Sequence, residues 1–243
     1  MIESPKQQEL FPEDSQEEAE EESVVGEDSN PYVLYVCDVE TTGKDPKVHD
    51  IIEICLWRIS DGQSKTWCLK PLNPEAIEDE ALAVNKHKRE DILHKTAHGR
   101  QTYLPPDEVL PEIEMWLMED GAAAEDRVFI GQNVMFDYEH CVELWKKVGS
   151  PENFPFGMWQ GTREDLWNQG FLIDTMMIAR LIDIATGKRR KRYGLGGLVK
   201  DFGVTRATAH RADGDVKMTQ ELFLKMFEPL AKIMKEQFSD KYA

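Results

Sequence analysis

The sequence lacks the features that mark membrane, secreted and zinc-binding proteins. No apolar run approaches the length of a membrane span, and the N-terminus has no positively charged stretch followed by an apolar one. The four cysteines, Cys37, Cys55, Cys68 and Cys141, are scattered and form no CxxC pair, so neither a disulfide framework nor a zinc site is indicated. We therefore expect a soluble, cytoplasmic protein with no membrane partner, whose cysteines serve as small core residues.

Basic residues are scarce relative to acidic ones. The 243 residues include 29 Lys and Arg against 46 Asp and Glu, which gives a formal net charge of −17. Residues 1–30 hold eleven acids and one base, a net charge of −10 that leaves −7 for the other 213 residues. Such a chain does not attract nucleic acid through its bulk charge. If the substrate is a polynucleotide, metal ions and local basic patches must hold it.

Residues 1–30 are predicted to form a disordered acidic tail, because acids dominate and apolar residues are few. Within this tail the spacing Gln7-x-x-Leu10-Phe11 resembles the short peptide by which bacterial replication proteins dock on the sliding clamp. A flexible tail would present two adjacent apolar anchors to a groove, and the Gln amide would fix the register. The alternative is a chance match of three positions.

The rest of the chain alternates between strand-like and helical patterns. Short runs of β-forming apolar residues predict strands at 32–37, 50–59, 64–69 and 127–131. Helical periodicity is found at 77–84, 88–94, after Pro106, after Asp137, and at 176–184, 195–202 and about 213–227. A hairpin followed by alternating strands and helices predicts one α/β domain with a mixed sheet over 31–228, and 229–243 is expected to be a helical tail.

Two acids close the first predicted strand. Asp38 and Glu40 are two residues apart, so on a strand their side chains point to the same side. Unpaired buried carboxylates are costly, and a hard cation such as Mg²⁺ would neutralise them. The alternative is that both acids lie past the strand end in a solvated turn.

Three further groups stand out later in the chain. Asp137 opens a helix in the pattern Asn133-x-x-Phe136-Asp137, where the helix N-terminus favours a carboxylate anion. His210 precedes the last helix and Asp215 lies early in it, which suits a base beside a fixed carboxylate. Taken singly, these residues have ordinary interpretations as a helix cap, a surface histidine and a solvated first-turn acid. Their joint order after the acid pair of the first strand indicates one divided site.

Two stretches carry less specific signals. The run 188–192, Lys-Arg-Arg-Lys-Arg, is the densest positive block of the chain, and it is either a phosphate contact or a solvated loop. Residues 149–170 show no clear period and are expected to form a long loop or insertion. The aromatic residues at 154–167 could stack on a nucleic-acid base.

In this order the motifs resemble the DEDDh family of exonucleases, which includes the proofreading subunit of bacterial replicative DNA polymerase and ribonuclease T. The resemblance covers about residues 32–228 and implies a ribonuclease-H-like α/β fold, with a mixed central sheet flanked by helices, and two Mg²⁺ or Mn²⁺ ions. The position used by tyrosine-dependent relatives is Arg211 here, so the histidine class fits. The family's four metal-binding acids and its catalytic histidine fall on Asp38, Glu40, Asp137, Asp215 and His210. Positions near the family's terminal nucleotide are Thr41, Thr42, Asn133 and Phe136.

The resemblance implies a metal-dependent 3′-to-5′ exonuclease. His210 would take a proton from the attacking water, the 3′ oxygen of the penultimate nucleotide would leave, and a 5′-mononucleotide would be released. We expect single-stranded DNA ends as the substrate, in replication proofreading or repair, with a polymerase or the sliding clamp as a partner. One alternative is an RNA 3′-end trimming enzyme like ribonuclease T, which the motifs do not separate from a DNA enzyme. Another is a non-catalytic clamp or polymerase adaptor, against which the intact set of five residues argues.

Overall fold

The structure is a computed structural model that describes residues 31–93, 103–157, 172–205 and 211–242, with side chains up to Lys232. In chain order its strands are β1 (Val33–Thr41), β2 (Ile51–Arg58), β3 (Ser64–Cys68), β4 (Arg127–Gly131) and β5 (Leu172–Asp174). Its helices are α1 (Asp79–Asn85), α2 (Arg89–Leu93), α3 (Pro106–Met118), α4 (Val134–Val148), α5 (Thr175–Thr186), α6 (Leu195–Asp201) and α7 (Ala212–Tyr242). Short 3₁₀ turns lie at Pro74–Ala76, Ala124–Asp126 and Pro151–Asn153.

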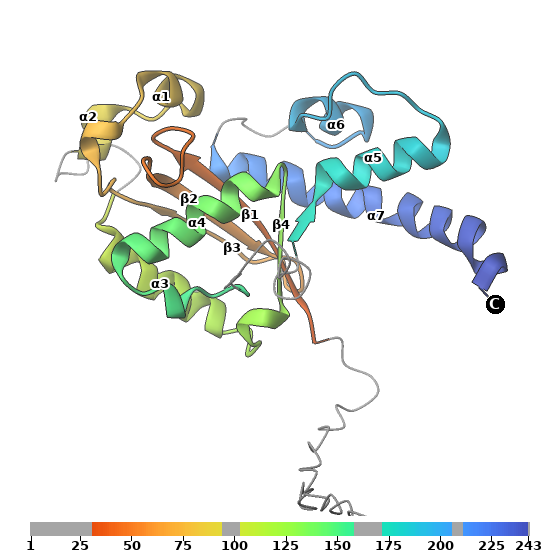
Figure 1. The fold of residues 1–243 in the computed structure, drawn as a ribbon, viewed down its shortest axis with the longest axis horizontal. Helices are drawn as coiled ribbons and strands as arrows, with labels where there is room; N and C mark the ends of the chain where they lie inside the picture. Colours follow the sequence, from red (N-terminus) through yellow and green to blue (C-terminus); the bar gives the residue numbers. More distant parts are fainter. Residues whose placement is uncertain (1–30, 94–102, 158–171, 206–210, 243) are drawn as a thin grey trace, which may run out of the picture. The chain divides into compact units, whose positions relative to one another are not determined.

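The five strands form one mixed sheet in the order β3-β2-β1-β4-β5 (Figure 1). Strands β1, β2 and β3 pair antiparallel, whereas β4 and β5 run parallel to β1. The hairpin of β2 and β3 and the crossovers through helices follow from the turn at 61–62 and from the alternating patterns of the sequence. The predicted α/β class and mixed sheet are confirmed, and β1 lies at the centre with a paired strand on each side.

Alternation along β1 divides the core into two layers. Tyr35, Cys37 and Val39 pack with α3 and α4 on one face, in a cluster that includes Ile113 and Leu144. The intervening residues of β1 therefore face the opposite layer, because successive side chains of a strand point to opposite faces.

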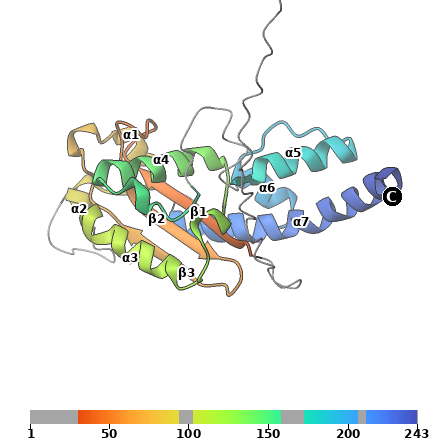
Figure 2. The same ribbon diagram turned by 60° about the horizontal axis from the view of Figure 1, so that its bottom comes forward.

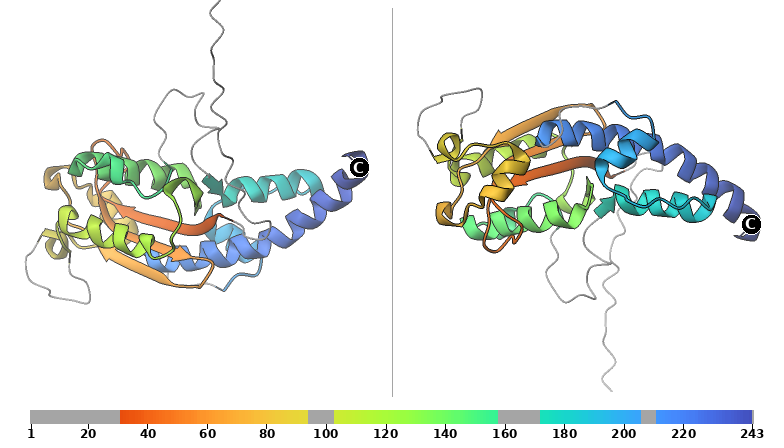
Figure 3. Two further views of the ribbon diagram at one scale, coloured as in Figure 1. Left: turned by 90° about the horizontal axis from the view of Figure 1, so that it is seen from below. Right: turned by 90° about the horizontal axis from the view of Figure 1, so that it is seen from above.

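The second layer consists of α5, α6 and α7. Val36 of β1 packs there with Ile178, Leu198 and Leu222, one from each of these helices. Figures 2 and 3 show the helices on the two sides of the sheet. Asp38 and Glu40 follow Val36 at even spacing, so the fold directs both carboxylates towards α7.

The start of the expected loop at 149–170 belongs to the core. Phe154 and Phe156 are each only 4% exposed, and their rings make edge contacts with Trp145 and Phe129 at centroid distances of 5.4 and 5.0 Å. The suggestion that these two aromatics stack on a base is therefore wrong, because apolar burial against α4 and the sheet holds them inside. The remaining aromatics of this stretch lie outside the described residues.

The cysteines and the last helix have defined positions in the structure. Cys37, Cys55 and Cys141 are buried, Cys68 is half-buried, and all four are free thiols. The last helix runs through Pro229 as one element to Tyr242, so the expected helical tail continues α7 without a break. Among the described helices, none combines the length and the apolar character needed to cross a membrane.

Candidate active site

The central strand carries the first two site residues within its length. β1 runs to Thr41, and Asp38 and Glu40 are paired across the ladder with Cys55 and Glu53 of β2. The pairing with β2 keeps the backbone extended through the acids, even though acidic residues are poor strand formers. The alternative of a solvated turn is therefore excluded, and both half-buried side chains point to the α7 face.

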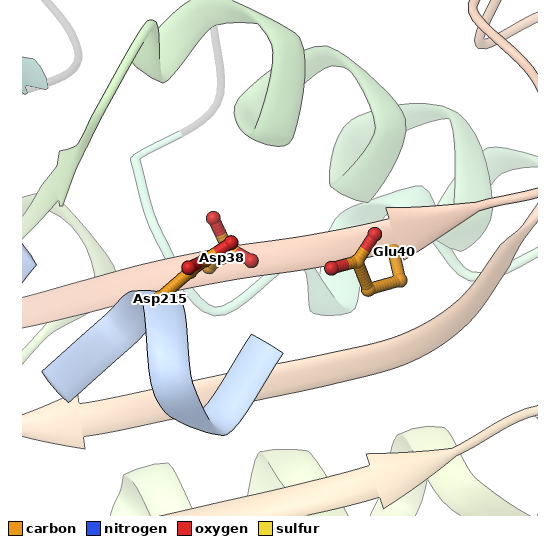
Figure 4. Close-up of side chains that lie close together, drawn as sticks. All are labelled: Asp38, Glu40 and Asp215. Atoms are coloured by element: carbon orange, nitrogen blue, oxygen red, sulfur yellow. The ribbon is translucent and has the colours of Figure 1, made fainter. Parts of the chain in front are cut away.

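A third carboxylate reaches the same place from α7. Asp215 lies in the first turn of this helix, and one oxygen from each of Asp38, Glu40 and Asp215 lies within 4.8 Å of the others. Figure 4 shows the three side chains between β1 and the start of α7. Three carboxylate oxygens at this spacing are the donors that hard divalent cations take in proteins. The chemistry of the donor set thus fits Mg²⁺ or Mn²⁺.

The fourth predicted acid lies beside this group and has a second partner. Asp137 is buried in the first turn of α4, and its Oδ1 accepts a hydrogen bond of 2.9 Å from the backbone N–H of Val39. α4 begins after Asn133, whose positive φ of 64° is one that asparagine tolerates better than most residues. Asp137 is not one of the three acids within 4.8 Å, so the structure brings it to the edge of the cluster.

The pKa values of these acids are raised by burial and by the charges of their acidic neighbours. Burial, followed by the charge of Asp137, raises the pKa of Asp38 well above its ordinary value. Burial and the charge of Asp215 raise the pKa of Glu40 to about 8. The pKa of Asp137 also rises to about 8, mainly through burial, although the N–H of Val39 opposes the shift. Cations bound here would relieve this repulsion and hold the carboxylates ionised.

The expected general base, His210, lies outside the described residues. The following residue, Arg211, is described, and its guanidinium pairs with the carboxylate of Glu53 at 2.8 Å. The role of His210 therefore remains a prediction from the sequence.

A cleft of about 800 Å³ opens beside the acids. Thr41, Asn133 and Phe136, three of the four residues predicted to lie near a terminal nucleotide, line this cleft together with Glu40. Thr42 does not line it, because it is fully buried, where its Oγ1 accepts a hydrogen bond from the N–H of Asp50. The cleft volume is in the range of small-molecule sites and suffices for one nucleotide.

A further wall of the cleft is formed by residues that belong to none of the sequence motifs. It is formed by α1 and the residue before it, and it includes Glu78, Glu80 and Val84. Val84 is 58% exposed, so it presents an apolar surface to the cleft and not to the core. The helical pattern at 77–84 predicts the helix of this wall, but nothing in the sequence indicates that Val84 faces a cleft.

Gly43 forms part of the cleft where the chain leaves β1. A Cβ atom added there would lie 2.3 Å from Cδ2 of the buried His49 ring. The ring is held in place, since its Nε2 lies 3.3 Å from Oε1 of Glu78. This part of the cleft is therefore backbone, and no side chain fits.

The basic run at 188–192 has two kinds of residue. Arg190 is a structural residue, because its guanidinium pairs with Asp183 and Asp201 and its side chain is only 7% exposed. Within the described part of the chain, Arg189, Lys191 and Arg192 are exposed and form no ion pair. Arg190 is therefore not available for a phosphate contact. The two alternatives, a phosphate contact or a solvated loop, remain for Arg189, Lys191 and Arg192.

The end of this basic run lies near the cleft. The backbone carbonyl of Tyr193 accepts a hydrogen bond of 2.6 Å from Nε2 of Gln132. Gln132 directly precedes Asn133, which lines the cleft. Arg192, the neighbour of Tyr193, is therefore anchored close to the same rim.

The fold and the acid cluster together match a known class of enzyme. The family model described as "Exonuclease" (RNase_T) matches residues 35–223, most of the chain. The chain therefore belongs to this exonuclease family, as the DEDDh resemblance implied, and the membership supports the predicted 3′-to-5′ exonuclease activity. Members of the family use divalent metal ions, in agreement with the acidic cluster.

The sequence relatives are DNA polymerases. The chain is 29% identical over 205 residues to the PolC-type DNA polymerase III of Thermotoga petrophila, and 27% identical over 203 residues to that of Staphylococcus haemolyticus. These matches cover 82% and 83% of the chain but only 12% of each relative. The chain thus spans a small part of the length of the polymerases that it matches.

Solved structures share the fold. The structure of Escherichia coli exonuclease I in complex with a dT13 oligonucleotide has a TM-score of 0.61 at 15% identity, over 86% of this chain and 43% of that one. The structure of cell-death related nuclease 4 has a TM-score of 0.59 at 14% identity, over 82% of this chain and 64% of that one. At this identity the likeness shows a common ribonuclease-H-like fold.

Proposed function

We propose that the chain is a divalent-metal-dependent 3′-to-5′ exonuclease that releases 5′-mononucleotides from single-stranded DNA ends. The observation that carries this proposal is the convergence of Asp38, Glu40 and Asp215 within 4.8 Å at the edge of a nucleotide-sized cleft. Metal ligands next to a cleft for one nucleotide are what removal of a terminal residue requires.

The metal-binding residues of the proposal are Asp38, Glu40 and Asp215, with Asp137 alongside. Two Mg²⁺ or Mn²⁺ ions bound there would stabilise the charge that develops on the attacking and leaving oxygens during phosphoryl transfer. The protein's own contribution is to hold these carboxylates on a rigid central strand and on the first turn of α7. Asp137 also ties α4 to β1 through the N–H of Val39.

The cleft residues have separate tasks in this proposal. Phe136 and Val84 offer apolar surface to a base, and Thr41 and Asn133 offer polar groups to the sugar. His210 accepts a proton from the attacking water, whose oxygen bonds to phosphorus while the bond to the 3′ oxygen breaks, and this oxygen takes up a proton as the 3′ hydroxyl of the shortened strand. The released nucleotide keeps its 5′ phosphate.

A DNA substrate is supported by the names of the relatives. The sequence matches are DNA polymerases, and one structural neighbour was solved with a dT13 oligonucleotide. The same relatives support a role in replication proofreading or repair, in the cytoplasm. The proposed partners are a polymerase and the sliding clamp, the latter through Gln7, Leu10 and Phe11, which lie outside the described residues.

One assay tests the proposal directly. Single-stranded DNA and RNA of matched sequence, labelled at the 5′ end, are incubated with the full chain in Mg²⁺, Mn²⁺ or EDTA. We expect a ladder of products shortened from the 3′ end on DNA, and no products in EDTA or with Asp38→Ala. Asp107→Asn, which changes an exposed acid of α3, serves as the matched control and should behave like the wild type. Faster degradation of RNA would replace the DNA assignment, and degradation in EDTA would refute the metal site.

A further inference from the structure

Glu53 of β2 contacts the start of α7, and we infer that it is a positioning residue that fixes the first turn of this helix, and with it Asp215, against the metal-binding strand. The inference rests on the proposed function only in one respect, namely that the bound metal ions serve nuclease activity. It assigns a role to a residue that is not one of the four metal-binding acids of the proposal.

Glu53 lies directly beside the site without joining it. It is the cross-strand partner of Glu40 in the ladder between β1 and β2. Direct partners in an antiparallel pair have Cβ atoms about 4.5–5.5 Å apart, and like charges at such positions repel. The side chain of Glu53 is nevertheless fully buried. A carboxylate there needs specific partners, and it has them on two sides.

The first set of partners belongs to the beginning of α7. Oε1 of Glu53 accepts a hydrogen bond of 3.0 Å from the backbone N–H of Ala212, and Oε2 lies 2.8 Å from Nη2 of Arg211. Ala212 is the first residue of α7, so its N–H has no acceptor within the helix. Glu53 thus caps a helix that begins 159 residues later in the chain.

The contacts continue from this cap to the metal site. The backbone carbonyl of Arg211 accepts hydrogen bonds from the N–H groups of Gly214 and Asp215, both at 3.0 Å. Glu53, Arg211 and Asp215 are therefore joined by an unbroken path of short contacts. A displacement of the Glu53 carboxylate would move the first turn of α7, and the carboxylate of Asp215 with it.

The ion pair with Glu53 also determines the position of the Arg211 guanidinium. Its guanidinium is held by Glu53, although the acids of the metal site are close enough for Arg211 to lower the pKa of Glu40. A shorter or absent carboxylate at position 53 would release this guanidinium towards Glu40. It would then compete with a metal ion for the same oxygens.

A further partner of Glu53, His87, provides a control for the contacts with α7. Nε2 of His87, between α1 and α2, lies 3.2 Å from Oε2 of Glu53, and Nδ1 of His87 lies 2.5 Å from the hydroxyl of Tyr103. This histidine is buried and contacts Oε2 of Glu53, which also pairs with Arg211, whereas the N–H of Ala212 bonds to Oε1. Its loss removes one partner of the buried carboxylate but leaves both the hydrogen bond from Ala212 and the ion pair with Arg211 in place.

The test uses substitutions that conserve charge, so that a simple electrostatic effect is excluded. Glu53→Asp keeps the charge but shortens the reach to Ala212, and Arg211→Lys keeps the charge but loses the planar fork. Mn²⁺ binding to the full chain is measured by titration calorimetry, together with the Tm and the kcat on single-stranded DNA. The reference for a lost ligand is Asp38→Asn, and the matched control is His87→Gln.

We expect Glu53→Asp to raise the Kd for Mn²⁺ roughly 10-fold, as for residues that orient metal ligands, and Arg211→Lys to act in the same direction. His87→Gln should lower the Tm but leave the Kd within about two-fold of the wild type, because the contacts of Glu53 with Ala212 and Arg211 remain. A folded Glu53→Asp with the wild-type Kd would overturn the inference. If that variant does not fold, an unchanged Kd in Arg211→Lys, at a partly exposed position, would overturn it. A wild type that binds Mn²⁺ without nuclease activity would refute the proposed function but not the positioning role.

Discussion

The backbone N–H of Val39 donates a hydrogen bond of 2.9 Å to Oδ1 of Asp137, across 98 positions of the chain. Val39 stands between Asp38 and Glu40, and its own side chain packs on the opposite face of the sheet. The bond therefore attaches α4 to the strand at the midpoint of the acid pair. Asp137 thus has a structural contact in addition to its proposed metal contact, and the two can be separated by mutation.

Asp137→Asn should separate them. The amide oxygen can still accept the hydrogen bond from Val39, but the negative charge is lost. We expect kcat on single-stranded DNA to fall roughly 10- to 100-fold. We expect the Tm of the metal-free protein to stay the same or to rise, because the raised pKa of Asp137 means that the fold disfavours its ionised form. A Tm several degrees lower would show that the amide does not replace the carboxylate in this bond.

The stability of the metal-free protein should depend on pH in a defined direction. Glu40 and Asp137 have pKa values of about 8 in the fold, above the ordinary value of a carboxyl group. A group with a raised pKa stabilises the fold fully below its unfolded pKa, and this contribution is lost as the pH rises through the folded pKa. We therefore expect the free energy of unfolding in EDTA to decrease from about pH 4.5 to pH 8. Urea titrations at several pH values would measure it.

Carboxyl groups with lowered pKa values act in a different range, and the lowered pKa of buried His140 makes the stability rise, not fall, with pH. The pKa of Glu53 is lowered, because His87 and Arg211 outweigh the effect of burial. Its contribution is present above the unfolded pKa and is lost only as the pH falls below it. The decrease between pH 4.5 and 8 thus belongs to the metal site. Saturating Mg²⁺ should flatten it, and a slope that is equal with and without Mg²⁺ would contradict this origin.

The exposed cations after Arg190 should affect long substrates only. Lys191→Gln combined with Arg192→Gln removes two charges near the rim of the cleft. We expect a higher KM on a 20-nucleotide single strand, and a plot of log KM against log salt that is shallower by about 1.4. Hydrolysis of a p-nitrophenyl ester of thymidine 5′-phosphate, which has no further phosphates, should be unchanged. The double variant Lys65→Gln and Lys146→Gln is the charge-matched control, and equal effects in both would rule out a local contact.

Phe156→Ala should destabilise the fold and spare the chemistry. The ring lies in the core against Phe129 and Tyr35, at centroid distances of 5.0 and 5.7 Å. Removal of a buried phenylalanine costs about 3–5 kcal/mol in the free energy of unfolding. Met115→Ala, at a side chain that is 63% exposed, should change it by less than about 0.5 kcal/mol. A stable Phe156→Ala variant with impaired DNA binding would restore the base-stacking role.

The N-terminal peptide makes an independent prediction about a partner. A synthetic peptide of residues 1–15 should bind a bacterial sliding clamp in a fluorescence anisotropy titration. Leu10→Ala together with Phe11→Ala should abolish binding, because these side chains are the apolar anchors. A peptide with Glu13→Gln and Asp14→Asn controls for charge and should bind as the unchanged peptide does. If the unchanged peptide does not bind, the clamp assignment is wrong.

The acidic residues of the first strand could be predicted from the sequence, because their arrangement depends on local spacing. Asp38 and Glu40 share a face as a result of the two-residue period of a strand, which needs no knowledge of the fold. The extent of β1 was harder to predict, since the strand continues through Thr41 only because β2 pairs with it. The sequence signal at Glu53 was weak, because it consisted only of an acid between apolar residues of a buried strand. Its partner Arg211 lies 158 positions away, and no local pattern connects them.

Residues whose role depends on tertiary partners were not predictable. Five consecutive cations look alike in the sequence, and only the positions of Asp183 and Asp201 distinguish Arg190 as the buried one. In the same way, Phe154 and Phe156 lie in a segment without periodicity, where nothing indicates a core position. They are buried because residues 151–157 return across α4, a long-range contact that composition does not report.

The lack of space for a side chain at Gly43 limits where new substrate contacts can arise in this enzyme. At Gly43 the cleft is lined by main chain backed by the His49 ring, so a side chain placed there by mutation would have to displace this ring. Elsewhere in the cleft, Glu80, Ala81 and Val84 of α1 are partly or largely exposed and free to vary. Selection for a different nucleotide or sugar would therefore act on α1, and a library aimed at new substrates should randomise these three positions first.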